Sequence, residues 1–212
     1  MYVVVEMQKI PEFSKGFPDY WLNYIARGSI SENSQINALA TTYVRLVEAA
    51  LREYESARLA LGEFWNNHGA FSMGHMHQAV SNFENCLSDM HRAISCFRRL
   101  RRHKYLTDAL SRTLNDDKPQ YISNSVSNVL RNIRNTVHHF ETQLLDEEWK
   151  EGDFIALLPD GIEIPHQTEP GQTVKTLDRL SIGEHQIMFS DLTAWLKEMA
   201  RYADKVARFQ RR

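Results

Sequence analysis

Cysteine and long apolar runs are both scarce in this chain of 212 residues, and each shortage excludes a class of protein. The two cysteines, Cys86 and Cys96, fall within one predicted helix. At ~1.5 Å of rise per residue they lie about 15 Å apart, which is too far for a disulfide. We therefore expect two buried thiols, a reducing compartment and no disulfide framework.

Neither sign of charge dominates, because 25 basic side chains face 27 acidic ones and the formal net charge is −2. The molecule as a whole is therefore not attracted to nucleic acid, and any basic binding surface must be local. The apolar run at residues 2–5 is too short for a signal peptide, and no run is long enough to cross a bilayer. We expect a cytoplasmic protein with no membrane partner, folded as a single domain over residues 1–212.

Apolar residues recur at spacings of three and four over most of the chain, which is typical of amphipathic helices. The pattern predicts a mainly α fold, a bundle of four to five long helices. The predicted helices cover residues 18–28, a long stretch from a cap at Ser31 or Asn33 to about residue 67, a third helix after the break at 68–69 with its apolar stripe over residues 76–100, residues 121–146 and the stretch from Ser190 onward. Residues 105–114 either continue the third helix or form a short one of their own.

Two segments depart from the helical period. Residues 1–17 contain a short β-branched run followed by proline and glycine, and we expect an extended arm. In residues 149–190, the runs 154–158 and 162–164 flank Pro159-Asp160-Gly161, which is typical of a tight turn. We predict a small β-hairpin insertion before the last helix, with a polar loop at 165–171 and one or two short strands in 173–182.

The chemically suggestive segment is 131–141, which gathers two arginines, two asparagines and two adjacent histidines inside a predicted helix. Ile133 and Val137 belong to the apolar stripe of that helix, and Arg134 and His138 share the neighbouring face. A guanidinium and an imidazole held on one rigid face can bind a phosphate and move a proton.

The order Arg134-Asn135, three residues, His139 resembles the signature of the HEPN superfamily. That signature is an arginine, a polar residue, and a histidine after four to six intervening residues. Arg131-Asn132 ahead of His138 is a second match. HEPN domains are bundles of four or five helices with the motif on a late helix, so the predicted architecture agrees with the resemblance.

The resemblance implies a homodimer whose facing motif helices form a cleft and, in active members, a metal-independent endoribonuclease of toxin or defence type. The implied partners are RNA and an antitoxin or other protein. Arg134 would bind the scissile phosphate and His139 would act as general acid and base, with Asn135 and His138 in support.

At about 100° per residue, Arg134 and His139 lie roughly 140° apart on one helix, so a cleft between two chains would align them better than one chain. His138 is the rival histidine, because it shares the face of Arg134. Two alternatives to a nuclease stay open. One is a non-catalytic dimerisation or regulatory module, and the second is a ligand-binding bundle with an apolar internal pocket.

Candidate substrate-binding residues are Arg131 and, in the basic cluster 98–104, Arg98, Arg101 and Arg102. The cluster could follow an RNA backbone. We favour a simpler role for it, favourable cationic charge at a helix C-terminus, since the chain is slightly acidic. His75 and His77 would point to different sides of a helix, and no cysteine pair supports a metal site, so we expect neither metal nor cofactor.

Overall fold

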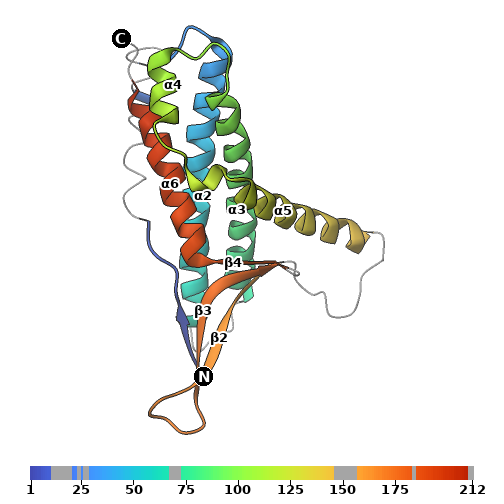
Figure 1. Ribbon diagram of the computed structural model, residues 1–212. Coiled ribbons are helices and arrows are strands. Elements are labelled where there is room, and N and C mark those ends of the chain that lie inside the picture. Colours follow the sequence, from blue (N-terminus) through green and yellow to red (C-terminus); the bar gives the residue numbers. More distant parts are fainter. Residues whose placement is uncertain are drawn as a thin grey trace. The chain divides into compact units, whose positions relative to one another are not determined.

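The computed structural model describes residues 1–10, 21–22, 25, 29–66, 73–145, 157–182 and 185–209, with the backbone alone for 138–145 (Figure 1). Over this part of the chain the protein is mainly helical, with five α-helices and one four-stranded sheet. The prediction of a mainly helical fold with a small β insertion before the last helix is confirmed. None of the described helices is both long and apolar enough to cross a membrane.

The chain forms two compact units. The sheet unit consists of Met1–Lys9, Glu53–Asn85 and Arg131–Thr193, and the helical unit consists of Ile10–Arg52, Cys86–Leu130 and Ala194–Arg212. Four helices contribute residues to both units, namely α2 (Ser34–Asn66), α3 (Met73–Arg101), α5 (Asn124–Leu145) and α6 (Phe189–Arg208). The short helix α4 (Asp108–Asn115) and the 3-10 helix η2 (Gln120–Ile122) belong to the helical unit.

Asn33 caps α2, as one of the two predicted alternatives has it. Its side-chain Oδ1 accepts hydrogen bonds from the backbone N–H of Gln35 at 3.0 Å and of Ile36 at 3.2 Å. These two N–H groups have no acceptor inside the first turn of the helix, so the cap satisfies them.

Residues 105–114 take the second of their two predicted forms. They enter a separate helix, α4, in which Thr107 Oγ1 accepts from Leu110 N at 3.4 Å.

Aromatic side chains from α2, α3, η2 and α6 form the core of the helical unit. The Phe97 ring lies 4.7 Å from Tyr43, 5.6 Å from Tyr121 and 5.2 Å from Tyr202, measured between centroids. All four side chains are fully buried. The Tyr43 hydroxyl donates to Met199 O at 2.9 Å, so Tyr121 is the donor in the 2.8 Å bond between the two phenols, because each phenol has one hydrogen.

The sheet unit is built on β3 (Thr173–Ile182). β3 pairs in parallel with β1 (Tyr2–Val5) and antiparallel with β2 (Leu158–Pro165) and β4 (His185–Met188). Figure 1 shows β3 between β1 and β2. The first residues of the predicted extended arm therefore form a strand, whereas residues 11–17 lie outside the described residues.

The predicted position of the hairpin turn is wrong. Pro159, Asp160 and Gly161 lie inside β2, and the pairing with β3 skips Asp178 between Asp160 and Gly161, which is a β-bulge. A Cβ at Gly161 would stand 1.6 Å from Thr176 O, so glycine serves close backbone approach here rather than a turn. Pro159 is tolerated because β2 is an edge strand.

The reversal between β2 and β3 occurs in the predicted polar loop. His166 Nδ1 accepts from the backbone N–H of Thr168 at 3.3 Å and of Glu169 at 3.1 Å, and Gly171 has a positive φ of 79°. The histidine nitrogen supplements the backbone bonds of this turn, in which Gln172 N donates to Glu169 O at 3.2 Å and His166 N donates to Gln172 O at 2.8 Å. The sequence pattern did not indicate this role. The predicted strand 154–156 and most of the predicted helix 18–28 lie outside the described residues.

The last helix begins one residue earlier than predicted, because α6 begins at Phe189, so Ser190 lies inside the helix and is not its N-cap. β4 runs directly into the helix at Met188, which leaves no separate capping position. Phe189 instead packs in the sheet unit, where its ring lies 5.7 Å from that of Phe83. The buried Thr193 Oγ1 donates back to Phe189 O at 2.7 Å and lies 2.9 Å from the Tyr54 hydroxyl.

Candidate functional site

The motif segment lies on α5, as predicted. Leu130 and Ile133 on this helix are buried, while Arg131, Arg134 and Asn135 are exposed. Among the described residues, neither of the two guanidinium groups has an ion-pair or hydrogen-bond partner. The helix therefore has one packed side and one solvated side, and the solvated side bears the cationic and amide groups.

His138 and His139 continue the same helix, but their side chains lie outside the described residues. The backbone places both on α5 with Arg134. The juxtaposition of Arg134 with either imidazole, within one chain or between two, stays a prediction.

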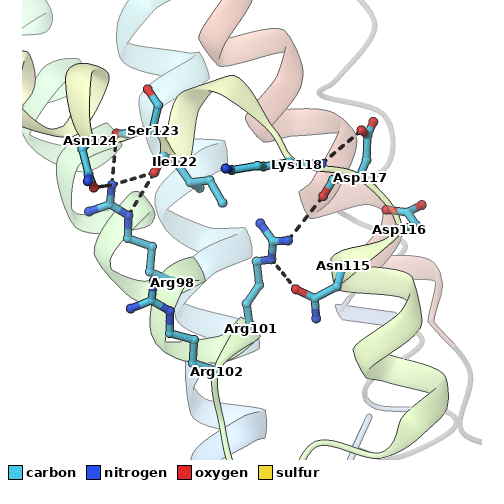
Figure 2. Close-up of a pocket in the computed structure, with 10 residues that line it drawn as sticks. All are labelled: Arg98, Arg101, Arg102, Asn115, Asp116, Asp117, Lys118, Ile122, Ser123 and Asn124. Atoms are coloured by element: carbon cyan, nitrogen blue, oxygen red, sulfur yellow. Dashed lines mark hydrogen bonds between the residues drawn. The ribbon is translucent and has the colours of Figure 1, made fainter.

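The structure brings Arg98, Arg101 and Arg102 together in a pocket of about 720 Å³ in the helical unit, which we call the arginine pocket. Figure 2 shows its three walls, which are the end of α3, the segment 115–118 and the turn that leads into α5. The lining residues are Arg98, Arg101, Arg102, Asn115, Asp116, Asp117, Lys118, Ile122, Ser123 and Asn124. Four cationic side chains and two acidic ones give the pocket a formal excess of positive charge.

Arg98 fixes one wall of this pocket. Its Nη2 donates to the carbonyl oxygens of Ile122 at 2.6 Å and Ser123 at 3.0 Å, and its Nη1 donates to Ser127 Oγ at 3.1 Å. Its Nε also donates to Ile122 O at 3.2 Å. The guanidinium thus holds the η2–α5 turn against α3, and most of its hydrogens are already used. This geometry favours a positioning role for Arg98.

Arg101 is partly engaged and spans the pocket toward the segment 115–118. Its Nε donates to Asn115 Oδ1 at 2.8 Å and its Nη2 to Asp117 O at 3.3 Å. Its guanidinium carbon also lies 5.8 Å from the centre of the Phe97 ring. Two of its five N–H groups are used in this way, and the remainder can serve a ligand.

Arg102 and Lys118 complete the lining, and both are exposed. No ion pair or hydrogen bond joins either cationic head to another described residue. In Figure 2 the Lys118 side chain extends from the segment 115–118 toward the turn at Ser123, above Arg101. The pocket therefore contains cations that the protein itself does not neutralise.

The two pocket carboxylates are neutralised from α6. Lys205 Nζ lies 2.5 Å from Asp116 Oδ2, and Arg201 Nη2 lies 3.3 Å from Asp117 Oδ2. Burial raises the pKa of the neighbouring Tyr202 phenol, and the negative charges of Asp116 and Asp117 raise it further. Each pocket carboxylate therefore has a cationic partner on α6, outside the pocket lining.

Sequence reasoning identified the three arginines of the pocket but missed Lys118, Ser123 and Asn124. The run Asn-Asp-Asp-Lys-Pro at 115–119 is typical of a helix stop, and α4 does end at Asn115. No local sequence pattern marks the pocket, because its residues come from separate parts of the chain. They belong to the end of α3, to the segment that follows α4, and to η2 and the start of α5. Among the described residues, no group of three His, Cys, Asp or Glu side chains could hold a metal ion.

Both cysteines are free and buried, as predicted. In comparisons with known proteins, no family model matches this chain, and neither does any curated protein or solved structure.

Proposed function

We propose that the protein is a HEPN-like RNA- or nucleotide-binding protein that acts as a homodimer and cleaves RNA without a metal ion. The observation that carries this proposal is the solvated face of α5, where Arg131, Arg134 and Asn135 are exposed beside the buried Leu130 and Ile133. Guanidinium and amide groups on a packed helix are well suited to bind phosphates, because the helix holds them in a fixed geometry.

In this proposal Arg134 binds the scissile phosphate. His139 takes the proton of the attacking 2′-hydroxyl and returns one to the leaving oxygen, while Asn135 and His138 orient these groups. Because roughly 140° separate Arg134 from His139 around one helix, each site combines the arginine of one chain with the histidine of the other. An antitoxin or other protein partner would act by covering this cleft.

Incubation with single-stranded RNA in EDTA tests the enzymatic part. We expect cleavage that survives the chelator, is lost in Arg134→Ala and His139→Ala, and persists in Arg112→Ala. Arg112 is an exposed arginine of α4 outside the motif, and it serves as the charge-matched control. If the unmodified protein does not cleave RNA, the proposed endoribonuclease activity is ruled out.

RNA binding is measured separately by mobility shift. We expect Arg131→Ala and Arg134→Ala to weaken binding, whereas Arg112→Ala leaves it unchanged. Binding without cleavage would instead support the non-catalytic regulatory module. Equal affinity in all three variants would exclude this face of α5 as the RNA-binding surface.

A further inference from the structure

Two cationic side chains that line the arginine pocket, those of Arg102 and Lys118, have no hydrogen-bond or ion-pair partner among the described residues. Its three walls meet in a space of about 720 Å³, which is within the roughly 300–1,000 Å³ typical of small-molecule sites. We infer that this pocket binds a phosphate dianion, either inorganic phosphate or the phosphate monoester of a mononucleotide. The inference does not depend on the proposed function, because it uses no residue of the α5 motif.

The charge balance of the pocket favours an anion. Asp116 and Asp117 are paired with Lys205 and Arg201 of α6, so their negative charge is countered without the pocket cations. The heads of Arg102 and Lys118 keep their full positive charge toward solvent. A dianion entering the pocket therefore meets attraction from both sides and little repulsion from the two carboxylates.

The donors of the pocket converge from different elements. Arg102 and the unused N–H groups of Arg101 come from the end of α3, and the Lys118 ammonium comes from the segment 115–118. Ser123 and Asn124 stand at the N-terminus of α5, a helix of 22 residues whose first turn carries partial positive charge. Three terminal oxygens of a monoester match such a set of donors better than the two free oxygens of a diester.

Arg98 makes this arrangement stable before a ligand arrives. Its five bonds to Ile122, Ser123, Asn124 and Ser127 hold the start of α5 beside the end of α3. The wall that bears Ser123 and Asn124 is therefore already in place. A preformed set of donors costs less ordering entropy on binding than a loop that must fold around the ligand.

The lining also indicates which part of a nucleotide is recognised. Ile122 is the single apolar side chain among the ten lining residues, and none of the ten is aromatic. The described lining therefore offers no aromatic ring for a base to stack on, whereas aromatic stacking dominates most single-stranded nucleic-acid sites. The phosphate is the recognised group, and the identity of the base has little influence.

Isothermal titration calorimetry with inorganic phosphate, AMP, adenosine and dimethyl phosphate tests the inference on the full chain. We expect saturable binding of phosphate and AMP with similar affinity, and no binding of adenosine. Dimethyl phosphate, a diester, should bind at least about tenfold more weakly than phosphate because it loses one charge and one acceptor. A stronger response to AMP than to phosphate, with adenosine also binding, would overturn phosphate recognition.

Variants locate the site. Arg102→Ala and Lys118→Ala should each weaken phosphate binding about tenfold or more, since each removes one charge-assisted contact. Arg99→Ala is the matched control, because Arg99 is an exposed arginine of α3 that does not line the pocket. Lys118→Arg should keep most of the affinity. Equal losses in Arg99→Ala and Arg102→Ala, or no saturable binding by the unmodified chain, would overturn the inference.

Discussion

Tyr43 and Tyr202 occupy the same buried aromatic cluster, yet their hydroxyl groups have different surroundings. The Tyr43 hydroxyl donates to Met199 O and accepts from Tyr121. The Tyr202 hydroxyl is buried and has no hydrogen-bond partner among the described residues. Its ring is nonetheless well placed, because Arg201 and Lys205 lie 5.2 Å and 4.7 Å from its centre. The ring of Tyr202 is therefore useful to the fold, whereas its hydroxyl is not.

Removing the Tyr43 hydroxyl should destabilise the fold, whereas removing the Tyr202 hydroxyl should stabilise it. Tyr43→Phe removes the bond to Met199 O and leaves the buried Tyr121 hydroxyl without its acceptor, so the free energy of unfolding should fall by about 1–3 kcal/mol. Tyr202→Phe removes an unsatisfied buried group and should raise the free energy of unfolding by about 1 kcal/mol. Urea denaturation followed by circular dichroism measures both. A loss in Tyr202→Phe as large as that in Tyr43→Phe would show that the hydroxyl has a partner.

Cys96 makes stability depend on pH in the alkaline range. Its thiol donates to Leu39 O at 3.1 Å, which the thiolate cannot do. Burial raises the pKa of this thiol from its ordinary value of 9.0 to about 11, against the opposing effect of Arg99. The folded state therefore holds the proton more tightly than the unfolded chain. The resulting stability is complete below pH 9 and declines as the pH rises toward 11.

We expect the free energy of unfolding of the unmodified protein to fall between pH 9 and 11, and to fall less steeply in Cys96→Ala. Urea titrations at several pH values across this window measure the two slopes. The buried tyrosines titrate in both proteins and so cancel in the comparison. If the free energy of unfolding falls equally steeply with pH in both proteins, ionisation of Cys96 does not contribute to the pH dependence of stability.

At the scale of elements, glycine has opposite effects on stability in a strand and in a helix of this chain. Gly161 in β2 leaves no room for a Cβ, which would stand 1.6 Å from Thr176 O. Gly62 lies inside α2, and a Cβ there would meet no atom within 4 Å. The first glycine is required by close packing of two strands, and the second costs the helix conformational entropy.

Gly161→Ala should lower the free energy of unfolding by at least about 2–3 kcal/mol, because β2 and β3 must separate to admit the methyl group. Gly62→Ala should raise it by about 1 kcal/mol. Thermal denaturation of both variants gives the comparison. If Gly161→Ala proved as stable as the unmodified protein, the backbones of β2 and β3 would not approach each other as closely at Gly161 as described.

The long helices could be predicted from the sequence because their signal is repeated many times. In α3 the predicted apolar stripe over residues 76–100 is buried from Ala79 through Phe83 to Leu100, whereas Met76 at its start is half-buried. Asn33 could also be predicted as a cap, since a short amide side chain before an apolar period has a local mechanism.

The hairpin turn and the pocket could not be predicted, for two different physical reasons. Proline, aspartate and glycine at 159–161 satisfy turn chemistry, but pairing with β3 outweighs that local preference. Arg102, Lys118 and Ser123 approach one another only through tertiary packing, so no window of sequence contains the site. Of the α5 motif, the exposure of Arg131, Arg134 and Asn135 agrees with the predicted solvated face.

At the scale of the whole molecule, the proposed dimer makes a prediction that single variants cannot test. If each site uses Arg134 of one chain and His139 of the other, then mixing inactive Arg134→Ala and His139→Ala proteins restores one intact site in every mixed dimer. After equilibration, random pairing should recover roughly a quarter of the unmodified activity, since half of the dimers are mixed and each has one of two sites. If mixing recovers no activity, Arg134 and His139 of each site belong to the same chain.

The parallel pairing of β1 with β3 has a consequence for how the protein folds as it is made. The Tyr2 hydroxyl donates to Glu169 Oε2, 167 positions along the chain, and residues 2–5 pair with residues 174–177. On the ribosome, β1 must wait for almost all of the intervening chain before its partner exists, whereas each helix can form as its own turns emerge. Closure of the sheet is therefore a late folding step, and nascent chains stalled before residue 173 should expose β1 to chaperones.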